Sequence, residues 1–234
     1  MSRNNHKMKQ LYIEMVQVCV NYADFLKITL PLSKNQFDKI IVVTAPHDKK
    51  TIKVCNNNNV ECVITDRMYE DKNDILNKGK GLNEGIKKLQ KKDWLLITDT
   101  DIAFPSNTRS IINKYVEDKD TIYWAGRRFC LNRQEWKNYC KDNSITKTWI
   151  EQAGRKTAGL GFFQLVNFET SLIKQKTEKE IWYTETCGDC RGSDRRFFRE
   201  WGMDKRIKFP RKEFCVIHLG APVENWAGRE SPNF

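Results

Sequence analysis

Short apolar runs alternate with amphipathic stretches through the first two-thirds of the chain. Five runs are typical of β-strands, because apolar residues dominate them and turn residues bound them. They cover residues 11–20, 39–43, 60–64, 94–97 and 121–124. Helical spacing of apolar residues marks the segments between them, which are residues 23–32, 49–55, 74–90 and 106–116. We expect the first of these helices to end near Pro31. The alternation predicts an α/β fold with a doubly wound sheet and helices on both faces.

The pattern is less regular beyond residue 126. Helical spacing covers residues 132–140 and 194–201, and apolar runs typical of strands cover residues 159–166 and 213–218. Residues 143–158 are polar and have no clear period. We find no internal repeat and no interdomain linker, which favours one domain over residues 1–234. We expect it to have two functional halves, about residues 1–125 and 126–234.

The composition indicates a globular protein with a strongly polar surface, since 39% of the residues are hydrophobic and 30% are charged. No apolar run approaches the ~20 residues that span a bilayer. The start of the chain is polar and basic without the apolar core of a signal peptide, so we expect a cytoplasmic protein. The formal net charge of +11 favours anionic partners such as nucleic acid, lipid headgroups or a nucleotide diphosphate.

Several of the eight cysteines lie inside apolar strand-like runs, where a reduced cysteine behaves as a small hydrophobic residue. Cys187 and Cys190 have the spacing of a redox or zinc motif, but no second pair completes a four-ligand site. We interpret them as free thiols on a loop, and their role stays open.

Two acids follow the apolar run of residues 94–97. Asp99 and Asp101 are two positions apart, and in extended chain such side chains project to the same side. Ligands of open parallel sheets bind outside the carboxyl ends of the strands, where two acids are costly without a positive partner. Mg²⁺ or Mn²⁺ suits this pair, because both prefer oxygen ligands. The alternative is an acidic turn that caps the next helix.

Two neighbouring segments carry a family resemblance. Residues 77–85 read NKGKGLNEG, and residues 92–102 read KDWLLITDTDI, with Pro105 beyond. Together they resemble the nucleotide-sugar half of GT-A glycosyltransferases. A helix start rich in Gly, Lys and Asn offers N–H groups and cations to a diphosphate. An ordinary amphipathic helix explains the lysines but not three glycines, each of which costs about 1 kcal/mol.

The resemblance continues downstream. Residues 159–165, which include Gly161, are similar to the small-residue strand that lines the donor sugar in this superfamily. Residues 192–198 resemble the helix whose leading acid is the catalytic base of inverting members, which assigns that role to Asp194. Ser193 stands where that motif usually has another acid, and an acid favoured by the helix dipole is the alternative. His218 lies in a segment that resembles the metal-binding C-terminal segment of many members.

The resemblance implies a GT-A-like mixed, mainly parallel sheet and a metal-dependent glycosyltransferase of the hexosyltransferase type. The first half would bind a UDP- or GDP-linked sugar, and the second would bind the acceptor and carry catalysis. The acceptor would be a glycan, a lipid-linked molecule or a protein, with peripheral contact to an anionic membrane and no nucleic acid partner. Asp101, His218 and Asp99 would hold Mn²⁺ or Mg²⁺. Asp99 would be the alternative contact to the ribose, because the first acid of this motif often reaches the ribose in these families. The remaining donor contacts would be Asn21, Asp48, Asp66, Lys78, Lys80, Asn83 and Gly161.

Two other functions fit parts of the sequence. A sugar-phosphate nucleotidyltransferase shares the α/β layout, but it usually has a loop with glycine and lysine after the first strand. Residues 21–24 of this chain contain neither. A basic nucleic-acid-binding protein would use clustered basic residues with interleaved aromatics, for which residues 127–129 and 195–198 are candidates.

Overall fold

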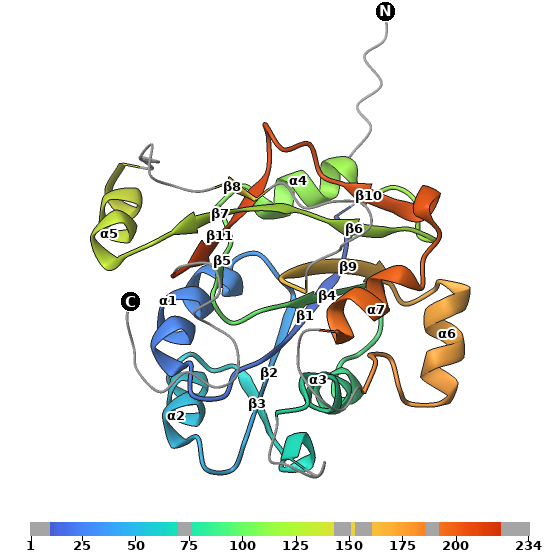
Figure 1. Cartoon of the computed structure of the whole chain (residues 1–234), viewed down its shortest axis with the longest axis horizontal. Coiled ribbons are helices and arrows are strands. Elements are labelled where there is room, and N and C mark those ends of the chain that lie inside the picture. Colours follow the sequence, from blue (N-terminus) through green and yellow to red (C-terminus); the bar gives the residue numbers. More distant parts are fainter. Residues whose placement is uncertain (1–9, 70–75, 143–150, 153–160, 186–191, 221–234) are drawn as a thin grey trace, which may run out of the picture.

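The computed structural model describes residues 10–69, 76–142, 151–152, 161–185 and 192–220 (Figure 1). Its larger sheet has seven strands in the order β10-β6-β9-β4-β1-β2-β3. These strands are β1 (Ile13–Val18), β2 (Lys39–Thr44), β3 (Glu61–Ile64), β4 (Trp94–Thr98), β6 (Ile122–Trp124), β9 (Phe163–Asn167) and β10 (Arg206–Lys208).

The large sheet is mixed but mainly parallel. Strand β1 is parallel to both β2 and β4, while β9 is antiparallel to its neighbours β4 and β6. The strand order reverses between β1 and β4, because the chain runs from β1 through β2 to β3 and then crosses back. Every residue of β4 is buried, as its central place in a sheet covered on both faces requires. The predicted fold class is confirmed.

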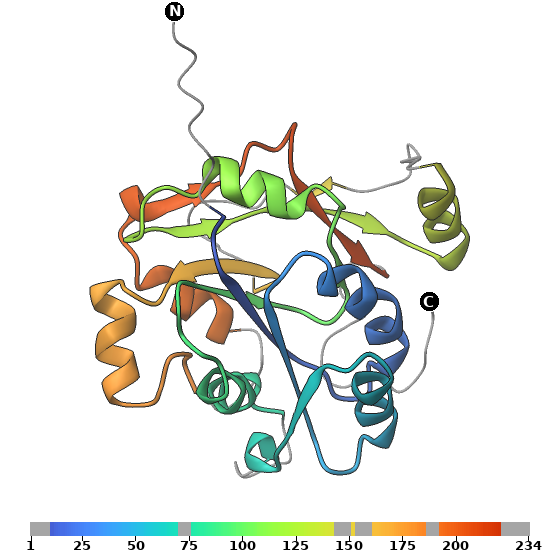
Figure 2. The ribbon, with the colours of Figure 1, turned by 180° about the vertical axis from the view of Figure 1, so that it is seen from behind.

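Helices pack on both faces of this sheet (Figures 1 and 2). On one face α1 (Ala23–Lys34), α2 (Lys49–Asn57) and α4 (Thr108–Tyr115) contribute side chains such as Leu26, Cys55 and Ile112 to one apolar core. On the other face α3 (Lys78–Lys87), α6 (Ser171–Glu178) and α7 (Ser193–Arg199) contribute Leu82, Ile173 and Phe197 to a second core.

A second, four-stranded sheet crosses the end of the first, in the order β5-β11-β7-β8. Its strands are β5 (Ile102–Ala103), β11 (Cys215–Leu219), β7 (Gly126–Cys130) and β8 (Glu151–Gln152), and α5 (Arg133–Asp142) follows β7. Strand β11 is antiparallel to β5 and parallel to β7. This sheet joins the residues just after Asp101 to the strand that carries His218.

Several predicted boundaries need correction. Helix α1 continues through Pro31 to Lys34, because its buried face, which includes Leu30 and Ser33, extends past the proline and packing outweighs a lost hydrogen bond. Helix α3 begins only at Lys78, where the Asn77 side chain accepts a hydrogen bond from the Lys80 N–H. The pattern did not predict α6, β5, β7, β8 or β10, nor the 3-10 helices η1 (Arg67–Tyr69) and η2 (Met203–Lys205).

Cys187, Cys190 and most of the polar stretch 143–158 lie outside the described residues. Among the helices that are described, none has the length and apolar character needed to cross a bilayer.

Candidate active site

The two acids after β4 lie in a turn whose backbone is held by buried threonines. The Thr100 hydroxyl donates to the Val18 carbonyl of β1 at 2.8 Å, and the Thr29 hydroxyl of α1 donates to the Thr100 carbonyl at 2.8 Å. These bonds fix the segment at the carboxyl ends of β1 and β4. The chain turns at Thr100 and Asp101, so the backbone is not extended there, and a cation shared by Asp99 and Asp101 stays a prediction.

Asp99 pairs with a lysine. Its Oδ1 accepts a hydrogen bond from Lys78 Nζ at 2.5 Å, and its side chain is about one-third exposed (32%). Burial alone would raise the pKa of the Asp99 carboxyl, but the charge and hydrogen bond of Lys78 outweigh burial and hold the pKa below its usual value. Asp99 is therefore ionised at neutral pH.

Asp101 faces His218 instead, at 3.3 Å between Oδ2 and Nε2, and both side chains are buried. The antiparallel pairing of β11 with β5 sets His218 opposite Ile102, and the Leu219 N–H donates to the Asp101 carbonyl at 2.8 Å. Burial lowers the pKa of His218 although Asp101 opposes this, so the imidazole is neutral at pH 7. Its buried Nδ1 has no hydrogen-bond partner among the described residues.

A neutral imidazole with an orphaned nitrogen beside a carboxylate has the donor chemistry of a divalent-metal site. In the described part of the chain, no three His, Cys, Asp or Glu side chains are grouped to hold a metal ion. The residues thus fit a site with two protein ligands, Asp101 and His218. Mg²⁺ bound to few protein carboxylates typically takes its other oxygens from water and substrate phosphates.

Asp194 lies in the first turn of α7 and is held on several sides. Its Oδ1 accepts hydrogen bonds from the Tyr183 hydroxyl at 2.5 Å and from Lys78 Nζ at 3.2 Å. The Gln164 amide of β9 donates to the Asp194 carbonyl at 3.0 Å. A Cβ atom at Gly161 would lie 2.1 Å from the carboxylate, so only glycine fits opposite it. Burial and the nearby Asp194 charge raise the pKa of Tyr183, which keeps its hydroxyl protonated as a donor.

Lys78 therefore links Asp99 to Asp194. Its side chain is 12% exposed. Burial lowers the pKa of Lys78, but the two carboxylates outweigh burial and raise the pKa above its ordinary value. Lys78 thus stays charged over the physiological range.

Arg127 of β7 is a further cation at the site. Its guanidinium lies 4.6 Å from the ring centroids of both Phe129 and Phe162, which is cation–π geometry. Burial lowers the pKa of Arg127, and the charges of Asp99, Asp101 and Asp194 oppose that effect. The sequence had marked Arg127 only as a possible nucleic-acid contact.

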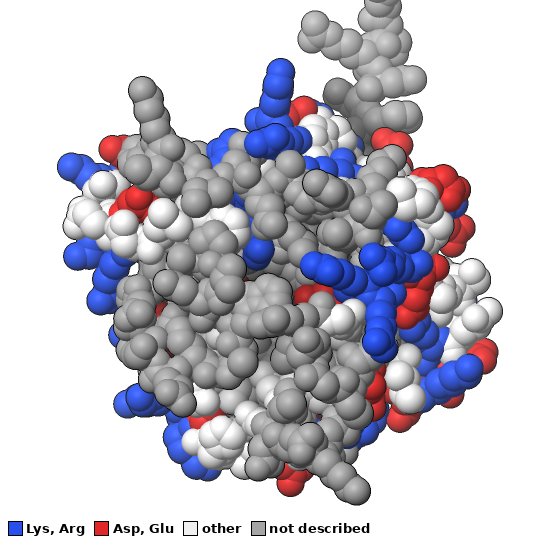
Figure 3. Space-filling view, in the orientation of Figure 1, with Lys and Arg blue, Asp and Glu red and all other residues white. Residues whose placement is uncertain are grey.

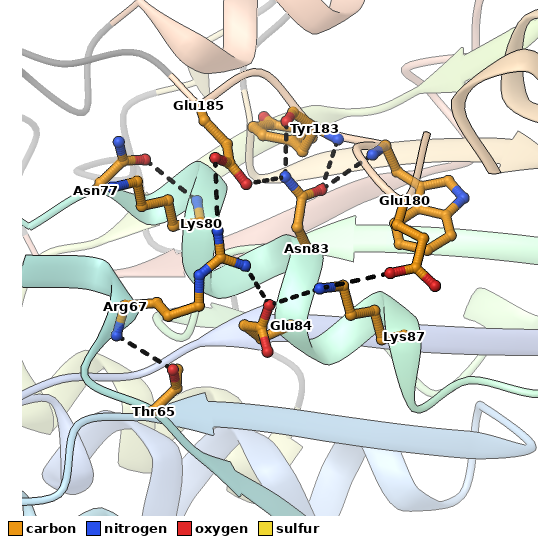
Figure 4. Close-up of polar contacts among 11 residues, drawn as sticks. Thr65, Arg67, Asn77, Lys80, Asn83, Glu84, Lys87, Glu180, Tyr183 and Glu185 are labelled. Carbon is orange, nitrogen blue, oxygen red and sulfur yellow. Dashed lines mark hydrogen bonds and ion pairs between the residues drawn. The ribbon is translucent and has the colours of Figure 1, made fainter. Parts of the chain in front are cut away.

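Asn83 holds the segment that carries Tyr183 (Figure 4). Its carbonyl oxygen accepts from the N–H groups of Trp182 and Tyr183, and its amide nitrogen donates to the Tyr183 carbonyl and to Glu185. Its side chain is fully buried, so the structure gives Asn83 a positioning role, and its direct contact with the donor stays a prediction. Gly79 serves the same packing, because a Cβ there would lie 2.1 Å from the Thr184 carbonyl oxygen.

The other predicted donor contacts lie along the same edge of the large sheet. Asp48 caps α2 through Thr51 and accepts a hydrogen bond from the Asn21 N–H at 2.7 Å, which brings Asp48 and Asn21 together after β2 and β1. Asp66 is exposed in the turn before η1, and Lys80 is half-buried in the first turn of α3. Both stay predictions as donor contacts.

No protein-family model matches the chain, and no curated protein matches its sequence. Solved structures do match. Mannosyltransferase PcManGT from Pyrobaculum calidifontis, in complex with GDP-Man and Mn²⁺, is similar with a TM-score of 0.55 and 12% identity, over 93% of this chain and 59% of that one. Glucosyl-3-phosphoglycerate synthase from Mycobacterium tuberculosis, in complex with Mn²⁺, UDP-Glc and phosphoglyceric acid, gives 0.52 and 11%, over 91% of this chain and 73% of that one.

The chain has the GT-A fold. The similarity at 11–12% identity establishes the architecture, and the roles of individual residues rest on the geometry above. This GT-A chain spans about three-fifths of the length of the mannosyltransferase. Figure 3 shows basic side chains gathered over α7. The GT-A chain exposes Arg195, Arg196 and Arg199 on this helix, next to Asp194.

Proposed function

We propose that this GT-A chain is a metal-dependent glycosyltransferase that moves a sugar from a UDP- or GDP-linked donor to an acceptor hydroxyl. The observation that carries the proposal is the contact of Lys78 with both Asp99 and Asp194. This contact brings together Asp99, which follows β4, and Asp194 of α7. They lie at the end of the sheet where the strand order reverses. Such an end is where open α/β sheets bind nucleotides. The fold it shares with PcManGT, solved with GDP-Man and Mn²⁺, supports the same donor class.

Asp101 and His218 would hold Mn²⁺ or Mg²⁺. When bound, the ion supplies positive charge that stabilises the leaving diphosphate. Lys78 and Arg127 add fixed positive charge from two different elements. Such preorganised charge costs no reorganisation during the reaction, so these side chains favour departure of the diphosphate.

Asp194 would take the proton of the acceptor hydroxyl as that oxygen attacks the anomeric carbon and inverts it. Its carboxylate is oriented by Tyr183 and Lys78, and Gly161 packs closely against it. The acceptor, which we infer to be a glycan, a lipid-linked molecule or a protein, would approach from the side of α7. We place donor binding in about residues 1–125 and acceptor binding and catalysis in about residues 126–234 of one domain.

A thermal-unfolding panel of nucleotide sugars tests this function. We expect UDP- or GDP-sugars to raise Tm with Mn²⁺ and to raise it much less in EDTA, because a ligand at about 100 times its Kd stabilises by about 2.7 kcal/mol. Asp101→Asn and His218→Gln should abolish the Mn²⁺ dependence, while the exposed control Asp120→Asn should keep it. No shift with any donor, or shifts unchanged in both site variants, contradict the proposed function.

A further inference from the structure

The Lys78 ammonium is shared unequally between two carboxylates. It lies 2.5 Å from Asp99 Oδ1 but 3.2 Å from Asp194 Oδ1. A charge-assisted N–H···O bond is normally 2.7–2.9 Å long, and it weakens as the distance grows. The contact with Asp194 is therefore the weaker of the two, and a competing anion displaces it first.

Tyr183 would keep Asp194 oriented if Lys78 moved away. The Tyr183 hydroxyl donates to the same oxygen at 2.5 Å, and this tyrosine is fully buried with its ring centroid 4.7 Å from that of Phe197. Asn83 holds the Tyr183 backbone at both its N–H and its carbonyl. The tyrosine is thus the more rigidly held donor, because the Lys78 ammonium lies at the end of a flexible four-carbon stem.

A diphosphate bound beside Asp99 would bring strong acceptor oxygens to the same ammonium. The ammonium is one rotatable group, and a shift of Nζ toward the phosphate oxygens would lengthen its already long contact with Asp194. The diphosphate carries about two negative charges against the single charge of Asp194, and the Asp194 oxygen that Lys78 contacts already accepts from Tyr183. The diphosphate is therefore the preferred partner of the ammonium.

We infer that Lys78 couples the two substrates, because the donor diphosphate and Asp194 compete for its ammonium, so that donor binding frees Asp194 for the acceptor hydroxyl. The inference rests on the proposed function. In this inference Lys78 stays hydrogen-bonded to the Asp194 carboxylate until the donor is bound. The inference also has an unusual consequence: removal of the base's charge should improve binding of the donor.

The test is a double-mutant cycle on nucleotide affinity, measured by titration calorimetry with UDP or GDP and Mn²⁺. Asp194→Asn should tighten nucleotide binding about threefold to tenfold, the range of one partly buried charged contact. In a Lys78→Met background the same Asp194→Asn change should leave the affinity unchanged, because the competition is gone. Glu200→Gln removes a carboxylate from the other end of α7, where it pairs with Lys176, and should have no effect in either background.

Three results overturn the inference. The first is that Asp194→Asn leaves nucleotide affinity unchanged or weakens it in the wild-type background. The second is that Asp194→Asn tightens binding equally in the Lys78→Met background. The third is that Glu200→Gln reproduces the effect of Asp194→Asn. The last two would show long-range electrostatics in place of competition. Thermal unfolding verifies that each variant is folded, and Lys78→Gln replaces Lys78→Met if the latter is not. Failure of the wild-type protein to bind UDP or GDP would instead refute the proposed function itself.

Discussion

Asp194 is held by several described residues of the candidate site. Tyr183, Lys78 and Gly161 each constrain its carboxylate, and Gln164 holds its backbone. A helix N-terminal acid that served only the helix dipole would not need these contacts, because the dipole effect requires no particular side-chain direction. Such positioning is what proton transfer in a defined direction requires.

Tyr183→Phe tests whether this positioning matters. Loss of the hydroxyl should lower the rate of sugar transfer about tenfold to hundredfold, the cost of a misplaced catalytic group, with nucleotide affinity unchanged. Tyr115→Phe is the matched control, since Tyr115 donates to Glu213 at 2.5 Å far from the site. Steady-state kinetics measure both variants, and equal rates for Tyr183→Phe and wild type contradict the assigned role.

Gly161→Ala tests the close packing of residue 161 against the same carboxylate. The added methyl group would lie 2.1 Å from it, so Asp194 must move, and overpacking of this kind costs about 1–3 kcal/mol. We expect the activation free energy of sugar transfer to rise by more than the free energy of unfolding falls. Gly192→Ala is the control, because its nearest neighbour would be Arg196 Nε at 4.0 Å. An active Gly161→Ala enzyme would show that Asp194 is not held against Gly161.

At the scale of elements, the strands with continuous apolar runs were predictable. The pattern located β2 and β4 within one or two residues, because burial on both faces leaves a run with no polar interruption. Strand β5 was not predictable. It has two residues, Ile102 and Ala103, and exists only through pairing with β11 more than a hundred residues later.

Only part of the candidate site was predictable from the sequence. Asp101 and His218 were found through a motif and are paired in the structure. Tyr183 gave no signal, because its contact with Asp194 depends on Asn83 and Gly79 holding a distant segment against α3. The glycines and asparagine of that helix were visible in the sequence, but their purpose depends on which backbone lies against them.

Helix α3 also carries a pH-dependent contact. Burial raises the pKa of Glu84, but hydrogen bonds from Lys87 and Arg67 outweigh burial and hold it below its ordinary value of 4.5 (Figure 4). Its stabilisation is therefore present above pH 4.5 and is lost as the pH falls through the lowered pKa. Glu84→Gln should cost about 0.5–1 kcal/mol at neutral pH, and the difference from wild type should vanish in acid.

Denaturant unfolding across pH measures this difference. Glu61→Gln is the control, because the pair that Glu61 forms with Lys39 is 3.4 Å long and its carboxylate is about half-exposed. A constant difference between Glu84→Gln and wild type from neutral pH to acid contradicts the assignment of the ion pair.

At the scale of the whole molecule, both predicted halves of the chain build one site. Strand β9 of the second half lies between β4 and β6 of the first, and β11 pairs with β5. Three carboxylates, Asp99, Asp101 and Asp194, face the cations Lys78 and Arg127. A divalent ion and a nucleotide diphosphate of about two negative charges bring opposite charge, so together they would leave the net charge of this site almost unchanged.

The most direct measurement of sugar transfer at this site needs no acceptor. Proton NMR can follow the sugar released when water replaces the acceptor, with α-linked UDP- and GDP-sugars and Mn²⁺. We predict slow release of the β-anomer as the first product from one donor class, lost in EDTA and in Asp101→Ala. Absence of release from every donor, or release that persists unchanged in Asp101→Ala, would contradict sugar transfer at this site, and an α-anomer as the first product would contradict inversion by Asp194.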